Sequence, residues 1–158
     1  IEIIQREKKN IYAKIIVQKK IKLRPGIQEV IYLAKKNQLK LGLATASSFT
    51  SVNALSTAIW KKPINEIFDF LVFGSEVQNK KPAPDIYKKI LGKLTLPANK
   101  AIAIEDSRIG LLAAKTAGLY TIVTPSSYTA QENFFEADEV CISLDKSSLL
   151  SSIKNLTC

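Results

Sequence analysis

Three groups of polar residues follow separate apolar segments of this sequence, and their chemistry suits a phosphate group and a metal ion. In chain order they are Thr45 and Ser47, with the backbone N–H of Ala46 between them, then Lys81, then Glu105 and Asp106. A hydroxyl and the backbone N–H groups that open a helix bind phosphate oxygens. A lysine ammonium neutralises phosphate charge, and carboxylate oxygens are the ligands that Mg²⁺ prefers. The residues therefore predict a site for a phosphoryl group and Mg²⁺.

Each group also has a structural alternative when it is taken alone. A threonine after a strand, such as Thr45, is more often a helix N-cap than a ligand. Lys80 and Lys81 precede a proline, where a lysine pair ordinarily faces solvent, and Asp106 has the form of a cap for the helix that follows. Glu105 is different, because a carboxylate that ends a buried strand must be paired or metal-bound. The occurrence of all three groups in order favours the binding site.

The composition excludes several kinds of catalysis within these residues. The 158 residues are 46% hydrophobic, enough for one domain with a core. There is no histidine, so Ser-His-Asp and Cys-His catalysis and histidine-ligated metals are excluded. The two cysteines, Cys141 and Cys158, make no disulfide framework, which favours the cytoplasm. No apolar run approaches the roughly 18 residues of a membrane span, so we expect no membrane partner.

The net charge of +9 comes mainly from lysine, because only three of the 23 basic residues are arginine. Nucleic-acid sites favour arginine for base contacts and aromatic residues for stacking, and neither clusters here. We therefore expect small anionic metabolites as partners and no nucleic acid. The alternative, nucleic-acid binding through the lysine-rich first segment, predicts a steep salt dependence of affinity.

Short apolar segments alternate with amphipathic ones along the chain. Strands are expected at residues 40–46, 70–74, 101–106, 119–124 and 139–143, and helices at 1–18, 25–36, 50–58, 84–91, 107–118 and 146–154. This alternation predicts an α/β domain whose parallel sheet is covered by helices on both faces. Ligands bind at the carboxyl ends of the strands in such sheets, so the three polar groups should meet at one rim.

The segments LGLATASS, GSEVQNKKPAPDIY and AIAIEDSRIGLLAAKTAG resemble the second, third and fourth motifs of haloacid dehalogenase (HAD) superfamily phosphatases. The Lys-Pro-x-Pro-Asp form resembles the branch of phosphoglycolate phosphatases and β-phosphoglucomutases, and closer still the CbbY-like sugar-phosphate phosphatases of photosynthetic organisms. The resemblance covers about residues 23–140, with 36 positions from Thr45 to Lys81 and 24 from Lys81 to Glu105. It implies a three-layer, Rossmann-like core with a parallel sheet.

The resemblance also implies a role for each matching residue. Thr45, with Ala46 and Ser47, would bind the phosphoryl group, and Lys81 would stabilise both the phosphoryl group and the nucleophile. Asp106 would hold Mg²⁺ directly, and Glu105 would do so directly or through water. Three further residues lie close to these motifs: Lys80, without a defined role, and Ser48 and Asn53, near the substrate contacts of the family.

The sequence departs from the family pattern in one respect. The first motif of the family is a central strand that ends in Asp-x-Asp, which supplies the nucleophile and the general acid and base, and no Asp-x-Asp occurs here. The nearest approach is Asp69, which is followed two positions later by Leu71. Because the chain also begins with isoleucine, we expect an N-terminal truncation. Residues 1–22 would be a remnant of a helical cap domain, and residues 23–158 a HAD core without its central first strand.

We expect the intact protein to be a Mg²⁺-dependent phosphatase of small sugar phosphates that acts through an aspartyl-phosphate intermediate. The chain alone, without the nucleophile, should be inactive and unstable. Two alternatives remain open: a β-phosphoglucomutase-like mutase of phosphosugars, and a non-catalytic phosphate-binding module. We further expect a monomer in the cytoplasm, or in the plastid stroma if the source is an alga.

Overall fold

The computed structural model describes the backbone of residues 21–155 and the side chains of residues 21–151. The helix expected at residues 1–18, and nearly all of the expected cap remnant at 1–22, lie outside the described residues. No described helix is long and apolar enough to cross a membrane.

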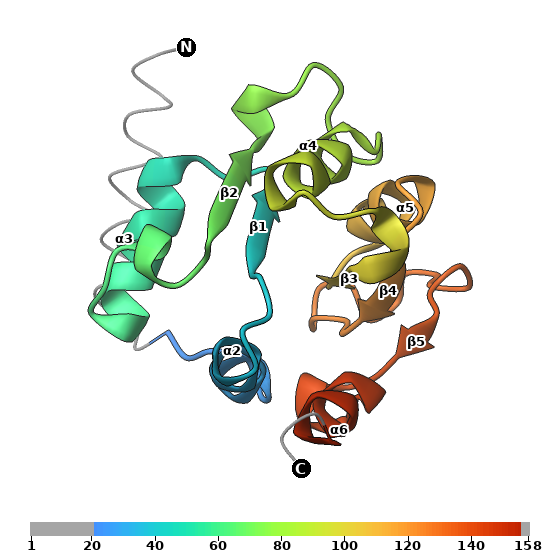
Figure 1. Ribbon diagram of the computed structural model, residues 1–158. Helices are drawn as coiled ribbons and strands as arrows, with labels where there is room; N and C mark the ends of the chain where they lie inside the picture. Colours follow the sequence, from blue (N-terminus) through green and yellow to red (C-terminus); the bar gives the residue numbers. More distant parts are fainter. Residues whose placement is uncertain (1–20, 156–158) are drawn as a thin grey trace.

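Strands and helices alternate along the described chain (Figure 1). The strands are β1 (Gly42–Thr45), β2 (Phe70–Phe73), β3 (Ile102–Glu105), β4 (Tyr120–Val123) and β5 (Glu139–Val140). The helices are α2 (Ile27–Lys36), α3 (Phe49–Trp60), α4 (Asp85–Leu94), α5 (Arg108–Thr116) and α6 (Ser148–Asn155). Short 3₁₀ turns, η1 to η4, occupy Ile64–Glu66, Gly74–Glu76, Ala98–Lys100 and Leu144–Lys146.

Local residues set the helix boundaries. The helix expected from Pro25 begins at Ile27 instead, because Gly26 precedes it in a left-handed conformation with φ of 84°. Serines begin the two helices near the predicted site: Ser48 caps α3, and Ser107 caps α5. Gly118, with φ of 84°, follows the end of α5 as its sequence position predicts.

The five strands form two parallel sheets (Figure 1). One sheet pairs β1 with β2, from Gly42 opposite Phe70 to Thr45 opposite Phe73. The other has the order β3-β4-β5, with Glu105 opposite Val123. The predicted α/β fold with parallel strands is therefore confirmed. Within residues 21–155 no strand hydrogen bonds join β1 to β3, so each of these strands has an unpaired edge.

Two apolar clusters form the core. In the first, Val72 of β2 and Ala103 of β3 are buried with residues of α4 and α5, such as Ile86 and Ala113. In the second, Ile122 of β4 is buried with residues of α2 and α6. The strands thus pack against helices from different parts of the chain, as a parallel sheet requires.

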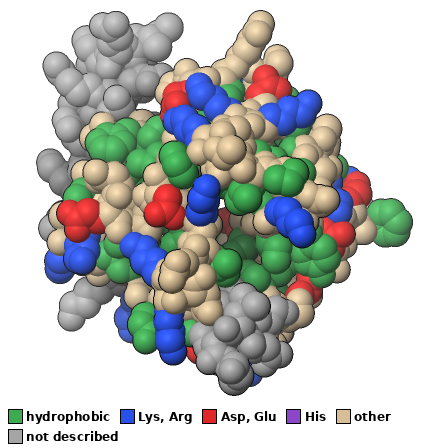
Figure 2. All heavy atoms as spheres, viewed as in Figure 1, with side chains coloured by type: hydrophobic (Ala, Val, Ile, Leu, Met, Phe, Trp, Pro, Cys, Tyr) green, Lys and Arg blue, Asp and Glu red, His purple; other side chains and the backbone are tan. Residues whose placement is uncertain are grey.

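The edge of β3 that lies toward β1 leaves apolar side chains uncovered. Ile102 is 49% exposed, Ile104 is 36% exposed, and the neighbouring Tyr120 is 45% exposed. A hollow of about 460 Å³ begins here, and Figure 2 shows a recess near the centre of the same face. The hollow is lined by Asn99, Lys100, Ala101, Ile102, Tyr120, Ile122, Ser148 and Leu149. Parallel strands are ordinarily buried on both faces, so this edge suits a further apolar strand. The resemblance inferred from the motifs implies that the first strand of the family would lie between β1 and β3.

Most predicted boundaries differ from the observed ones by one to three residues, and the two largest differences have a clear cause. The last strand ends at Val140 instead of residue 143, because the chain turns there into η4 and buries Leu144. Helix α4 continues past Leu91 to Leu94, whose side chain is buried in the first core cluster. In both cases a buried leucine, which a local sequence pattern does not identify as buried, decides where the element ends.

Candidate active site

Lys81 and Glu105 meet at the carboxyl ends of the strands. Lys81 lies in the loop after β2, and its Nζ is 2.5 Å from Oε1 of Glu105, the last residue of β3. The same Nζ donates to the carbonyl oxygen of Ala44 in β1 at 3.3 Å. The two side chains are only 15% and 9% exposed. Lys81 therefore bridges the two sheets directly beside Thr45, the residue that follows Ala44.

The loop that carries Lys81 is fixed by its own hydrogen bonds. The Lys81–Pro82 peptide is cis, and the Ala83 N–H donates to the Lys80 carbonyl oxygen at 2.9 Å. Lys80 donates through Nζ to the carbonyl oxygens of Gly74 and Val77, at 3.3 Å for Val77. These contacts give Lys80 a structural role that the sequence did not define: it holds the loop against the end of β2.

Tyr87 of α4 lies beneath the Lys81–Glu105 pair. Its hydroxyl donates to Glu105 Oε1, and Lys81 Nζ lies 5.0 Å from the centre of its ring. Burial, followed by the nearby Glu105 carboxylate, raises the pKa of Tyr87 well above its usual value, so the phenol stays a proton donor. Sequence analysis missed this residue. The one sequence feature that could have identified Tyr87 is its position on the buried face of the helix that follows Lys81.

The Glu105 carboxylate is held on both sides. Oε1 accepts from Lys81 and from Tyr87, as described above. On its other side the carboxylate packs against Gly110 of α5, where an added Cβ would lie only 1.9 Å from Oε2. Glu105 is therefore paired, as the sequence predicts for a carboxylate at the end of a buried strand. Both of these hydrogen bonds go to Oε1, and among the described residues no hydrogen bond to Oε2 is found, so Oε2 is available to a metal ion or to a water molecule.

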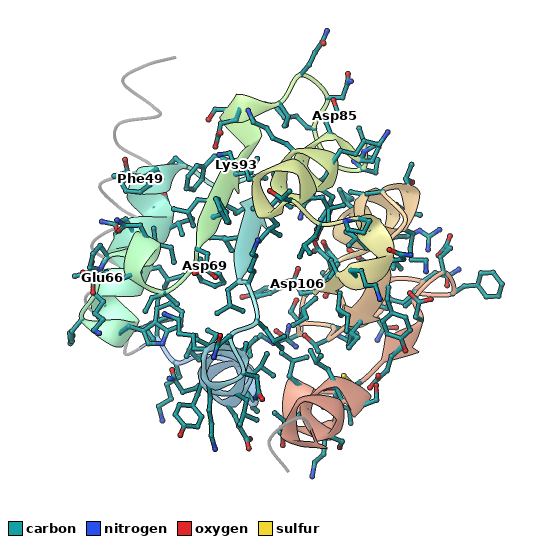
Figure 3. The ribbon with its side chains drawn as sticks, viewed as in Figure 1. Phe49, Glu66, Asp69, Asp85, Lys93 and Asp106 are labelled. Atoms are coloured by element: carbon teal, nitrogen blue, oxygen red, sulfur yellow. The ribbon has the colours of Figure 1, made fainter. Side chains whose placement is uncertain are left out.

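Asp106 is exposed, and Figure 3 shows it near the centre of the view, between β1 and β3. In the described part of the chain its carboxylate makes no hydrogen bond or ion pair, and its backbone oxygen accepts from Thr129 Oγ1 at 2.5 Å. Ser107, and not Asp106, caps α5. Asp106 thus has carboxylate oxygens available for Mg²⁺. Residues 21–155 contain no cluster of three or more potential metal-ligating side chains, so Asp106 fits a site completed by water, phosphate and further oxygen ligands.

Thr45, Ala46 and Ser47 form the turn between β1 and α3. The Ser47 N–H donates to Thr45 Oγ1 at 3.1 Å, and Ser48 caps the helix, so Thr45 is not its N-cap. A Cβ on Gly74 would lie 3.2 Å from Cα of Ala46, which brings this turn close to the end of β2. The turn therefore lies beside the Lys81 loop, with the exposed Ala46 and Ser47 at the rim of the sheet.

Two other residues singled out from the sequence have structural contacts. Asn53 Oδ1 accepts from the Ile64 N–H at 3.0 Å, which ties α3 to η1. Asp69, labelled in Figure 3, accepts from the Leu41 N–H at 2.7 Å. It directly precedes β2, whereas Lys81 lies in the loop that follows this strand. The position of Asp69 agrees with its rejection as a nucleophile.

Comparison with known proteins identifies the family of this arrangement. The model of the haloacid dehalogenase-like hydrolases matches residues 2–124, which is more than half of the chain. This chain belongs to the haloacid dehalogenase-like hydrolase family. The resemblance inferred from the three sequence motifs is therefore confirmed.

Three relatives illustrate the similarity. Protein CbbY of Rhodobacter capsulatus is 43% identical over 127 residues, which are 80% of this chain and 56% of the relative. A phosphorylated carbohydrates phosphatase of Thermotoga maritima is 33% identical over 75% of this chain and 51% of its own length. The crystal structure of a CbbY variant from Rhodobacter sphaeroides in complex with xylulose-(1,5)bisphosphate is 42% identical, with a TM-score of 0.88 over 90% of this chain and 64% of that chain.

This chain thus covers between half and two thirds of the length of each of these relatives. The match includes all three motifs, since Thr45, Lys81, Glu105 and Asp106 lie within the matched residues. It confirms the predicted fold of HAD type.

Proposed function

We propose that the full-length protein is a Mg²⁺-dependent phosphatase of small sugar phosphates. The observation that carries this proposal is the contact of Lys81 with Glu105 and with the Ala44 carbonyl oxygen, next to Thr45. It places an ammonium group, a hydroxyl and carboxylates at one rim of parallel strands, where such folds bind ligands.

Lys81 keeps one N–H for the substrate. A lysine ammonium has three donors, and the contacts with Glu105 and Ala44 use two of them. The third is available for a phosphoryl oxygen, with the hydroxyls of Thr45 and Ser47 and the backbone N–H group of Ala46 as further donors. A charge-assisted hydrogen bond of this kind strengthens as negative charge develops on the transferring group.

Asp106 would hold Mg²⁺ directly, and Glu105 would hold it directly or through a water molecule. The bound ion would neutralise part of the phosphate charge. This assignment rests on the exposed Asp106 carboxylate and on the hydrogen bonds of Glu105, which use only Oε1. Glu105 would thus fix the lysine through Oε1 and leave Oε2 for the metal.

The nucleophile would come from a strand between β1 and β3. Both strands have an unpaired edge there, and the relatives are longer than this chain. An aspartate at the carboxyl end of such a strand would lie beside Lys81. Its carboxylate oxygen would form a bond to phosphorus as the bond from phosphorus to the sugar oxygen breaks, and water would then hydrolyse the aspartyl-phosphate. Residues 23–158 would be the core domain, and residues 1–22 the end of the cap domain.

The substrate class follows from the relatives. The Thermotoga maritima relative is named for the phosphatase reaction on phosphorylated carbohydrates, and the CbbY structure contains a sugar bisphosphate. We therefore propose sugar phosphates as substrates and release of inorganic phosphate as the outcome. A mutase would instead convert one sugar phosphate to another without releasing phosphate.

Replacing Asp106 with asparagine should weaken Mg²⁺ binding at least about tenfold and lower phosphatase activity by roughly a hundredfold, because a carboxylate ligand of the ion is lost. The measurement is phosphate release by the full-length protein as a function of Mg²⁺ concentration. Asp69→Asn, exposed at the amino end of β2 and thus at the opposite end of the strands, is the control and should match the wild type. An unchanged Mg²⁺ dependence in Asp106→Asn would remove Asp106 from the metal site.

A further inference from the structure

Tyr87 contacts both members of the Lys81–Glu105 pair, although it is itself buried. Its hydroxyl donates to Glu105 Oε1, the same oxygen that accepts from Lys81. Its ring lies 5.0 Å from Lys81 Nζ, within the range of a cation–π interaction. The residue is 7% exposed and packs in the first core cluster, so a substrate at the rim would not touch it.

The shared oxygen determines how Lys81 distributes its donors. The Tyr87 hydroxyl donates one hydrogen bond to Oε1 of Glu105. The same oxygen accepts one N–H from Lys81, and the Ala44 carbonyl oxygen accepts another. Without the phenol, Glu105 would lose one of its two donors, and its carboxylate would be free to draw a second N–H from Lys81. Lys81 would then have no N–H left for a phosphoryl oxygen.

We propose that Tyr87 is a positioning residue, which holds Glu105 so that Lys81 keeps one N–H directed at the phosphoryl group. The expected effect on kcat rests on the proposed function, whereas the effect on the position of the Lys81 ammonium does not. Gly110 lies on the other side of Glu105 from Tyr87. Because glycine has no Cβ, the Glu105 carboxylate fits into the space beside it. The pair is thus fixed between α4 and α5, and the fold itself sets the direction of the lysine.

The test compares Tyr87→Phe with Tyr32→Phe in the full-length protein. Tyr32 is 60% exposed on α2 and serves as the matched control. Tyr87→Phe keeps the ring and removes only the donor. We expect about a tenfold lower kcat and less than a twofold change in KM, because the Thr45 and Ser47 hydroxyls and the Ala46 N–H still bind the ground state. Equal kcat values in Tyr87→Phe and Tyr32→Phe would overturn the proposal.

A double-mutant cycle separates positioning from a general packing effect. In a Glu105→Leu background, which has no acceptor for either donor, Tyr87→Phe should lower kcat by less than twofold, because the oxygen through which Tyr87 acts is already gone. If the tenfold loss persists there, Tyr87 does not act through Glu105, and the proposal is wrong.

The NMR signal of the Lys81 side-chain ammonium tests the geometry without any substrate. Tyr87→Phe should shift this signal, and Tyr32→Phe should leave it in place. An unmoved Lys81 signal in folded Tyr87→Phe would overturn the positioning role. If the wild-type protein hydrolyses no sugar phosphate and the Lys81 signal still shifts, the proposed function fails while the positioning of Lys81 by Tyr87 stands.

Discussion

Replacing Lys81 with methionine should lower the phosphatase activity of the full-length protein by about a thousandfold or more. Methionine has a similar length but no charge, so the phosphoryl group loses its one cationic side chain from this loop. Removing a single donor aimed at transition-state charge commonly lowers kcat by roughly 10²–10³-fold, and removing a cation at a transferring phosphoryl group lowers it by more. The measurement is kcat with a saturating sugar phosphate and Mg²⁺.

The same substitution should also destabilise the fold, since Glu105 would be left as a carboxylate only 9% exposed without its cation. Breaking such a pair is expected to cost roughly 2 to 4 kcal/mol of unfolding free energy. Adding Glu105→Gln to Lys81→Met should recover part of this stability without recovering activity. Lys88→Met, on the exposed face of α4, is the control for both measurements. A loss of activity below tenfold in Lys81→Met would contradict the assigned role of Lys81.

Replacing Gly110 with alanine should lower kcat by about a hundredfold and destabilise the protein, although alanine is ordinarily the better helix residue. The new Cβ would lie 1.9 Å from Oε2 of Glu105, so the carboxylate would have to leave its position. Misplacement of a catalytic group by about 1 Å can cost on the order of 10²-fold in rate. The measurements are kcat and the midpoint of thermal unfolding.

Gly92→Ala provides a matched control for Gly110→Ala. Gly92 lies inside α4, and a Cβ there would meet nothing within 4 Å. This variant should gain roughly 0.5–1 kcal/mol of stability and keep its activity, because only helix propensity changes. Equal kcat and equal unfolding midpoints in the two glycine variants would show that Glu105 does not need the space beside Gly110.

The strand ends and the site residues that lie there could be predicted from the sequence. Thr45 and Glu105 each end a short apolar segment, and parallel strands bring their carboxyl ends to the same rim. The spacing of Lys81 from both, with its prolines, identified the third motif. These features depend on residues that are close together in the chain, so they can be recognised in the sequence.

The contacts that fix the pair could not be predicted in the same way. Tyr87 and Gly110 lie on buried faces of two helices, and their pattern is that of ordinary core residues. Their role depends on how α4 and α5 pack around Glu105, which is a tertiary property. The short β5 and the longer α4 follow from the burial of Leu144 and Leu94, and this too is decided by packing and not by local pattern.

We propose that the full-length protein releases phosphate from sugar phosphates, with Mg²⁺, at the rim formed by Thr45, Lys81, Glu105 and Asp106. The most direct test measures inorganic phosphate released from a panel of sugar mono- and bisphosphates, with Mg²⁺ or with a chelator, by the full-length protein and by the 158-residue chain. We predict Mg²⁺-dependent release by the full-length protein and none by the 158 residues alone. Absence of release from every sugar phosphate by the full-length protein, or turnover by the 158-residue chain itself, would contradict this account.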